Sequence, residues 1–297
     1  MNPSLLPRLW LSEPDPDLLR EATDAGFPKS SVDDLAVAYA DLFLLNVYPY
    51  GSVFTDPSGE LSGPYAAWME QHYLAAGHAA TGLEHVAAAD HVGLCLDALA
   101  HLSRARTRDL DLVTSLQAWI PVLTLAVERE PGAHPFYREL ARRTRTELLS
   151  EAGSPQSTAD PAELGLLFEP SEEVHLSDVI RFLLAPARCG FFLSRARMGH
   201  LGRAAGARVP FGSRFDVARG LFERAGENGT VDDLMDSLEE ERIEWSRVYD
   251  ELARSAPSWM SHAVKWKARL ERTGEALATM RGIVQSPPEW EYQERES

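Results

Sequence analysis

The sequence has few cysteines and no long apolar run. Its 297 residues include only two cysteines, Cys95 and Cys189, which lie far apart and without the spacing of a metal site. A disulfide framework is therefore not expected, and the chain suits a reducing compartment. No segment approaches the roughly 18 uninterrupted apolar residues of a membrane-spanning helix. The first residues also lack the basic and apolar regions of a secretory signal, so we expect a cytoplasmic protein without a membrane span.

Basic residues are scarce, most of all in the first third of the chain. The sequence has 29 lysines and arginines against 45 aspartates and glutamates, for a net charge of −16. Residues 1–100 carry fourteen acidic side chains and only three basic ones. Clustered lysine and arginine are what bind a phosphate backbone, so this balance argues against a nucleic-acid partner. The acidic third instead favours a cationic partner, although it is also typical of a surface that only maintains solubility.

Alternating apolar and polar residues, the pattern of a half-buried strand, are nearly absent. Apolar residues recur at helical spacing instead, as in residues 31–47, where Leu35, Tyr39, Leu42 and Phe43 share one helix face. The sequence therefore predicts an all-α fold. Helices are expected at about 14–25, 31–47, 64–77, 90–106, 109–130, 135–151, 176–185, 189–205, 214–225, 231–254 and 258–284, with cap-like residues near four of the starts, Ser31, Asp90, Ser177 and Thr230.

One polar segment divides the chain. Residues 153–161 are rich in proline and serine and have no apolar periodicity. We expect one helical domain over residues 1–152 and a second helical unit over residues 162–285. Residues 286–297 combine Pro287-Pro288 with glutamate-rich polar sequence, so they are expected to form a flexible tail.

Signatures of enzymes are few. No glycine-rich phosphate loop, nucleophile elbow or dinucleotide fingerprint occurs. Asp232, Asp233 and Asp236 match the Asp-Asp-x-x-Asp pattern that holds a magnesium diphosphate in all-α isoprenoid synthases. Only 61 residues follow Asp236, too few for the second metal motif of those enzymes, and an acidic first helical turn accounts for the same residues. No metal site is expected either, because no two of the four neighbouring histidines lie on adjacent helical turns: His72, His78, His85 and His91.

Two short motifs stand beside the predicted helices. Tyr48-Pro49-Tyr50 follows the helix expected over residues 31–47. Pro49 fixes its own φ and keeps Tyr48 out of the helical region, so the chain must turn into a rigid corner that displays two aromatic side chains. The corner is either a helix stop or part of a peptide-docking pocket. Asp90 and His91 open the next strong helix, where they either cap it or expose a carboxylate and an imidazole to a ligand.

These motifs belong to a longer ordered series. The corner is followed by Gly63–Trp68, by Asp90-His91, by Trp119-Ile120-Pro121 and by His134-Pro135-Phe136-Tyr137-Arg138-Glu139-Leu140. In this order and approximate spacing, residues 31–150 resemble the TorD/DmsD/NarJ family of cytoplasmic chaperones for molybdenum-containing redox enzymes. One departure is Ala87-Ala88-Ala89, where the family often has Glu-Pro shortly before Asp-His.

The resemblance implies a TorD-like helical bundle and a non-enzymatic function, with no cofactor of the chain's own. Family members bind the twin-arginine signal peptide, or the N-terminal tail, of a molybdopterin oxidoreductase and hold it until its cofactor is inserted. An acidic first unit suits such a ligand, because a desolvated guanidinium needs carboxylate partners. The expected peptide-binding residues are Tyr48, Pro49, Tyr50, Trp68, Asp90, His91 and Trp119.

Other functions remain open at this point. One alternative is an all-α enzyme that acts on a diphosphate or another anionic small molecule. Another is an assembly factor that binds the folded catalytic subunit without a signal peptide. In each case we expect a monomer or a homodimer.

Arginines gather in the second unit. Residues 181–219 contain eight arginines and a single acid, Asp216. Clustered guanidinium groups suit an anion such as a nucleotide, the pterin phosphate or an acidic patch on the client, and Arg188, Arg195 and Arg197 are the candidates. Alternatively, these arginines pair with the acidic first unit.

Overall fold

The computed structural model describes residues 5–79, 86–105, 107, 109–151, 175–206 and 208–285. In this part of the chain every regular element is a helix, apart from one β-bridge, and the predicted all-α fold is confirmed. The first unit contains α1 (Leu5–Leu11), α2 (Pro16–Asp24), α3 (Val32–Tyr39), the π-helix η1 (Ala40–Asn46), α4 (Gly51–Thr55), α5 (Pro64–Ala75), α6 (Val92–Arg104), α7 (Leu110–Arg129) and α8 (Pro135–Ser150). The second contains α9 (Leu176–Leu184), α10 (Pro186–Cys189), α11 (Arg195–Ala204), α12 (Arg214–Asn228), α13 (Val231–Ser255), the 3-10 helix η3 (Pro257–Trp259) and α14 (Met260–Gln285).

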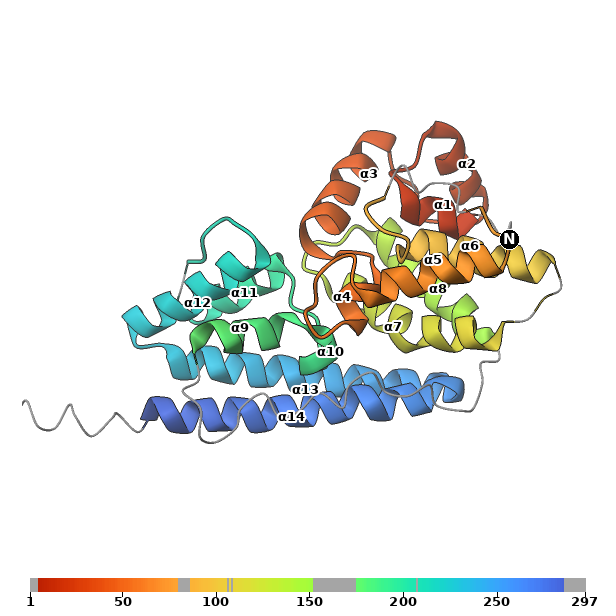
Figure 1. Cartoon of the computed structure of the whole chain (residues 1–297). Helices are drawn as coiled ribbons and strands as arrows, with labels where there is room; N and C mark the ends of the chain where they lie inside the picture. The colour runs from red at the N-terminus through yellow and green to blue at the C-terminus, as the bar shows by residue number, and fades with distance from the viewer. Residues whose placement is uncertain are drawn as a thin grey trace, which may run out of the picture.

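Helix α1 packs against α2, α6 and α8 in the first unit (Figure 1). Its Trp10 is fully buried, and the indole nitrogen donates a hydrogen bond to Thr144 Oγ1 at 2.9 Å. Tyr39 of α3 donates to the Trp10 carbonyl oxygen at 3.0 Å, and the Phe43 ring of η1 packs on the indole. Because these buried polar atoms are paired, one tryptophan ties α1 to α3, η1 and α8 at little desolvation cost.

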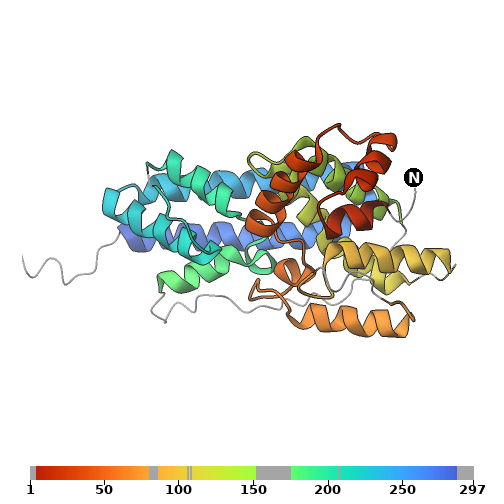
Figure 2. The ribbon, with the colours of Figure 1, turned by 90° about the horizontal axis from the view of Figure 1, so that it is seen from above.

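Helices α13 and α14 are the longest elements, and they run as a pair beneath the first unit and the other helices of the second unit (Figures 1 and 2). Part of the link from η3 and α14 to the first unit is made by two tryptophans. Trp259 and Trp266 donate from their indole nitrogens to the main-chain oxygens of Gln117 and Ala118 in α7, at 2.9 and 2.8 Å. The buried apolar side chains of the two units form one continuous core.

The predicted division of the chain stays a prediction. Residues 153–161 lie outside the described residues, and so do residues 286–297, which were expected to form a flexible tail. The shared core shows that the described residues of the first and second units pack as one body.

Helix α7 is both long and apolar. Its length and composition alone would allow it to cross a membrane, but 78% of its most apolar 18-residue stretch is buried inside the protein. It packs against α4, α6 and α8. A helix with apolar residues on all sides is typical of a protein core.

The long predicted helices are present with bounds shifted by a few residues, whereas the short helices α1, α4 and α10 were not predicted. Residues 190–194 were expected to be helical and instead form a turn at Gly190, which has a φ of +82°, and the segment that leads to α11. A Cβ atom on Gly190 would lie 2.8 Å from the Leu270 nitrogen, so only glycine permits this close approach to α14.

The expected helix starts are partly right. Ser31 caps α3 as predicted, because its Oγ accepts a hydrogen bond from the Asp34 nitrogen at 3.1 Å. Thr230 lies at the cap position of α13 but makes no capping hydrogen bond. The predictions for Asp90 and Ser177 are wrong, because α6 and α9 are preceded by His91 and His175.

Candidate functional site

The aromatic corner and the Asp-His pair lie together, joined by main-chain hydrogen bonds. The Gly51 nitrogen donates to the Asp90 carbonyl oxygen at 3.0 Å, and the Val92 nitrogen donates to the Pro49 carbonyl oxygen at 2.9 Å. These bonds frame the antiparallel bridge between Tyr50 and His91, whose rings meet edge to face with centroids 4.9 Å apart. The structure thus brings together two motifs about 40 residues apart, as one pocket lined by both would require.

Asp90 caps the neighbouring helix α4 rather than its own helix α6. Its Oδ2 accepts a hydrogen bond from the Ser52 nitrogen at 2.6 Å, in the first turn of α4. His91 is the N-cap of α6, and its Nδ1 accepts from the Gly93 nitrogen at 3.1 Å. Both side chains satisfy helix N-termini that would otherwise hold unpaired amides inside the protein.

The expected exposure of this pair is wrong. The side chains of Asp90 and His91 have exposed fractions of 0% and 1%. Burial lowers the pKa of His91 to about 3, so the imidazole is neutral, and burial raises the pKa of Asp90 above its usual range. Asp56, at the end of α4, is also buried, and its pKa is raised to about 6 by burial and by the nearby Asp90 charge. The buried side chains of Asp56, Asp90 and His91 therefore form a polar cluster under the corner, and the hydrogen bonds of Asp90 and His91 hold the neighbouring helix starts in place.

The remaining residues of the predicted pocket divide into a buried layer and an accessible one. Trp119 is fully buried and donates from its indole nitrogen to the Tyr65 hydroxyl at 3.0 Å. Trp68 stacks on the Tyr65 ring, with centroids 5.5 Å apart. Pro49 is buried, whereas Tyr48, Tyr50 and Trp68 are half-buried and reach the surface. Only these three side chains of the predicted set are therefore available for direct contact with a ligand.

A cleft of about 960 Å³ opens beside the corner, between the two units. One wall comes from the corner and the turn that follows α4, and the other comes from α9, α10 and the start of α12. The side chains and backbone that line it belong to Tyr48, Val53, Pro57, Ser58, Gly59, Glu60, Leu61, Asp178, Arg181, Leu184, Arg188, Ser213, Arg214 and Phe215. Of the residues predicted from the sequence, Tyr48 and Arg188 line this cleft.

The three arginines that were predicted to bind an anion have different partners in the structure. Arg188 Nε donates to the Pro57 carbonyl oxygen at 2.7 Å, at the edge of the cleft. Arg195 lies elsewhere and donates to the carbonyl oxygens of Leu45 and Gly212. Arg197 is paired with the buried Glu241, so the expected anion site does not include it. The alternative was pairing with acidic side chains of the first unit. None of the three arginines forms an ion pair with a described acid of that unit, although Arg197 attracts the buried Glu130.

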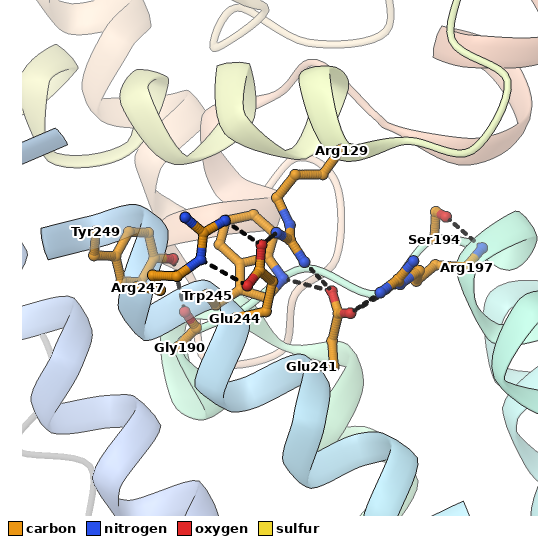
Figure 3. A network of polar contacts seen from close by, with 9 residues as sticks. All are labelled: Arg129, Gly190, Ser194, Arg197, Glu241, Glu244, Trp245, Arg247 and Tyr249. Atoms are coloured by element: carbon orange, nitrogen blue, oxygen red, sulfur yellow. Dashed lines mark hydrogen bonds and ion pairs between the residues drawn. The ribbon is translucent and has the colours of Figure 1, made fainter. Parts of the chain in front are cut away.

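Glu241 is the centre of a buried polar network (Figure 3). Its Oε1 accepts from Arg129 Nη2 of α7 at 3.0 Å and from the Trp245 indole nitrogen at 2.9 Å, while its Oε2 is bonded by Arg197 of α11. Arg129 also lies over the Trp245 ring, 5.0 Å from its centroid. One carboxylate on α13 thus ties the first unit to α11, a structural function rather than an anion site.

The sequence reasoning missed two arginines of the cleft, Arg181 and Arg214. Arg214 donates to the carbonyl oxygens of Leu193 and Leu184 at 3.0 and 3.1 Å and lies over the Phe192 ring. Burial lowers its pKa to about 10, so it remains charged near neutral pH. The signal was present in the excess of arginine over residues 181–219.

The Asp-Asp-x-x-Asp motif and the histidines do not converge. The Asp236 carboxylate accepts a hydrogen bond from Arg281 of α14 at 2.6 Å. This bond uses the carboxylate that a metal ion would need. His72 and His78 face the carboxylates of Asp109 and Asp97 with nitrogen–oxygen distances of 3.3 Å. His85 lies outside the described residues, and within those residues no three metal-ligating side chains cluster.

Comparison with protein families matches residues 15–128 to the family described as "Nitrate reductase delta subunit". Searches of curated proteins and of solved structures found no significant match. The matched segment includes the aromatic corner, the Asp-His pair and Trp119. This family, which includes the NarJ and TorD types, consists of maturation chaperones for molybdoenzymes. Residues 15–128 of this chain are therefore similar to the nitrate reductase delta subunit family, as the order of the motifs had indicated.

Proposed function

We propose that this chain is a cytoplasmic, non-catalytic chaperone for a molybdopterin oxidoreductase. It binds the twin-arginine signal peptide, or the N-terminal tail, of that enzyme and holds it until the cofactor is inserted. The family match over residues 15–128 carries the proposal, because this segment contains both the aromatic corner and the acidic surface beside it. In this proposal the chain binds the peptide reversibly, and such binding needs no catalytic group.

The acidic surface supports recognition of arginine. Asp41 of η1, Glu60 after α4 and Glu70 of α5 are exposed and form no ion pair with any described residue. All three lie on elements that flank the corner. Unpaired carboxylates attract a cationic segment during encounter, and they bind guanidinium groups with charge-assisted hydrogen bonds.

The half-buried aromatic side chains support binding of the apolar part of the peptide. Tyr50 and Trp68 reach the surface, and each combines a large apolar face with a polar edge. Pro49, Asp90, His91 and Trp119 lie beneath them and act by holding the corner in shape. We therefore assign contact to the upper layer and positioning to the lower layer.

Calorimetry with a twin-arginine signal peptide tests the proposal. We expect binding that weakens as salt increases and an affinity loss of about tenfold or more when both arginines of the peptide become alanine, since each desolvated charged hydrogen bond is worth about 1.5–3 kcal/mol. The triple variant Asp41→Asn, Glu60→Gln, Glu70→Gln should show the same loss with the unaltered peptide.

The matched control removes three exposed carboxylates elsewhere. Asp232→Asn, Asp233→Asn, Glu240→Gln changes the net charge equally, on the far helix α13. We expect it to bind the peptide nearly as the natural chain does. Equal weakening by both triple variants would mean that only net charge matters, and equal binding of the arginine and alanine peptides would refute arginine recognition.

A further inference from the structure

We propose that the cleft beside the corner is a second recognition site, which takes an apolar segment carrying carboxylates. Given the proposed function, this segment belongs to the client oxidoreductase and is distinct from its twin-arginine peptide. The chain would then contact the client through two surfaces of opposite charge: the exposed acids that flank the corner and the arginines of the cleft, with Glu60 at the boundary between the two.

The first observation is positive charge held in place by neutral groups: neither Arg188 nor Arg214 forms an ion pair with a described residue, although the buried Glu130 attracts Arg214 from further away. Arg188 is held by the Pro57 carbonyl oxygen, and Arg214 is held by those of Leu193 and Leu184. A carbonyl oxygen is neutral, so these bonds fix each guanidinium without cancelling its charge. Each arginine has five N–H donors, and the bonds in the described residues use one on Arg188 and two on Arg214. The remaining donors can bond a carboxylate.

The second observation is the balance of charge within the cleft. Arg181 pairs with Asp178 at 3.3 Å, and both are exposed enough for this ion pair to open cheaply. Glu60 is the only other acid among the lining residues. Three arginines against two acids leave the cleft cationic, in a region next to the strongly acidic first unit. A twin-arginine segment would be repelled here, and a carboxylate would be attracted.

The third observation is the apolar surface between the arginines. Val53, Leu184 and Phe215 line the cleft together with the ring of Tyr48, and Leu61 at its rim is 42% exposed. Apolar side chains of a bound segment would cover this surface and gain the usual benefit of leaving water. A cleft of about 960 Å³ has room for several residues of an extended segment.

The arrangement is less suited to a phosphate group. Phosphate sites commonly use the free amides at a helix N-terminus. Of the helices whose first turns reach the cleft, α9 carries Asp178 in that turn, and α12 carries Asp216, which forms a capping box with Ser213. The negative charge of these carboxylates repels an anion from the two helix ends, where free amides would otherwise bind it. We therefore favour a peptide whose carboxylates are spaced to meet separate arginines.

The test uses a labelled peptide of glutamate, leucine and serine, and a counterpart in which every glutamate is lysine. We expect fluorescence anisotropy to show saturable binding of the glutamate peptide and none of the lysine peptide. Arg181→Gln should weaken binding about two- to fivefold, as for an exposed charge pair, and Arg188→Gln about tenfold or more.

Arg219→Gln is the matched control. Arg219 also pairs with an aspartate three residues away, Asp216, and has similar exposure, but it does not line the cleft. It should leave binding unchanged. Because Arg181 is on the surface, its replacement keeps the test valid even if Arg188→Gln does not fold.

Several outcomes would overturn the proposal. They are equal binding of the lysine peptide, equal weakening by Arg219→Gln and Arg181→Gln, and displacement of the glutamate peptide by inorganic phosphate or GTP at lower concentration than by unlabelled peptide. The twin-arginine peptide separates this proposal from the proposed function. Its affinity should be unaffected by Arg181→Gln, and its failure to bind would refute the chaperone mechanism while leaving glutamate-peptide binding at the cleft as a separate result.

Discussion

The carboxylate of Asp90 is fully buried and holds the first turn of α4 against the start of α6. Removing this acceptor leaves the Ser52 nitrogen unpaired inside the protein. We expect Asp90→Ala to lower the free energy of unfolding by about 1–2 kcal/mol, measured by urea denaturation. Asp90→Asn keeps an acceptor and removes a buried charge, so it should be at least as stable as the natural chain at neutral pH.

The same Asn variant tests direct contact with the peptide. Because Asp90 has no exposed surface, we expect Asp90→Asn to bind a signal peptide as the natural chain does. A loss of peptide affinity at unchanged melting temperature would show that Asp90 touches the peptide after all, in a state more open than this structure.

Glu130 gives the protein a predictable response to pH. Burial, with a smaller effect of Asp41, raises its pKa to about 7, while Ser194, Arg197 and Arg214 act in the opposite direction. In the unfolded chain the same carboxyl group has a pKa of about 4.3. Between about pH 4.3 and about pH 7, Glu130 therefore keeps its proton in the folded state and loses it in the unfolded state. The free energy of unfolding should therefore fall as pH rises from about 4.3 to about 7, by up to about 4 kcal/mol from this residue.

Glu130→Gln should remove that part of the pH dependence. The difference in unfolding free energy between variant and natural chain, measured by urea denaturation at pH 5 and pH 8, isolates Glu130 from the other buried carboxyls. We expect the variant to gain stability relative to the natural chain as pH rises. Glu227→Gln, on an exposed side chain of α12, is the control and should follow the natural chain at both values. A constant difference for Glu130→Gln would mean that Glu130 is ionised in the folded protein throughout this range.

At the scale of single elements, the turn at Gly190 locks α10 onto α14. Its carbonyl oxygen accepts from the Tyr249 hydroxyl at 2.7 Å, and a Cβ atom there would meet the main chain of α14. Gly190→Ala combines a left-handed backbone with that collision, and we expect a loss of about 3 kcal/mol or more in unfolding free energy. Gly206→Ala is the matched control: its φ is +67°, but nothing lies within 4 Å of the added atom. It should cost only about 1 kcal/mol. Equal losses at the two positions would mean that contact with α14 is not tight.

Elements differ in how well the sequence predicts them. The long helices, such as α7 and α13, repeat their apolar pattern over several turns, so periodicity locates them. The helix α4 has five residues and α10 has four, too few for a period to be read. The π-helix η1 was predicted as ordinary helix, because the wider turn depends on packing that local propensity does not encode.

The candidate site shows the same limit. Tyr48-Pro49-Tyr50 and Asp90-His91 could be identified from the sequence, because proline geometry and motif order are local properties. Their burial could not, since Asp90 caps a helix from another part of the chain. The arginine excess was equally visible, but only the tertiary packing separates Arg188, which lines the cleft, from Arg197, which is paired with Glu241.

At the scale of the whole molecule, the Glu241 network joins the first unit to α11 and α13 (Figure 3). Glu241→Gln removes the charge shared by Arg129 and Arg197 and leaves two partly buried cations without it. We expect a loss of about 3–5 kcal/mol in unfolding free energy. Glu251→Gln, which affects only the exposed pair with Arg247 on the same helix, should change stability by less than about 1 kcal/mol. Similar effects of the two changes would show that the network does not hold the units together.

The most direct measurement is the molybdopterin content of the cell's molybdopterin oxidoreductases, purified from native cells with and without this chain. A maturation chaperone predicts that at least one of these enzymes accumulates without cofactor when the chain is absent. Restoring the natural chain should restore the cofactor, while restoring the Asp41→Asn, Glu60→Gln, Glu70→Gln variant should do so less well. Full cofactor content in every such enzyme without the chain would contradict the account.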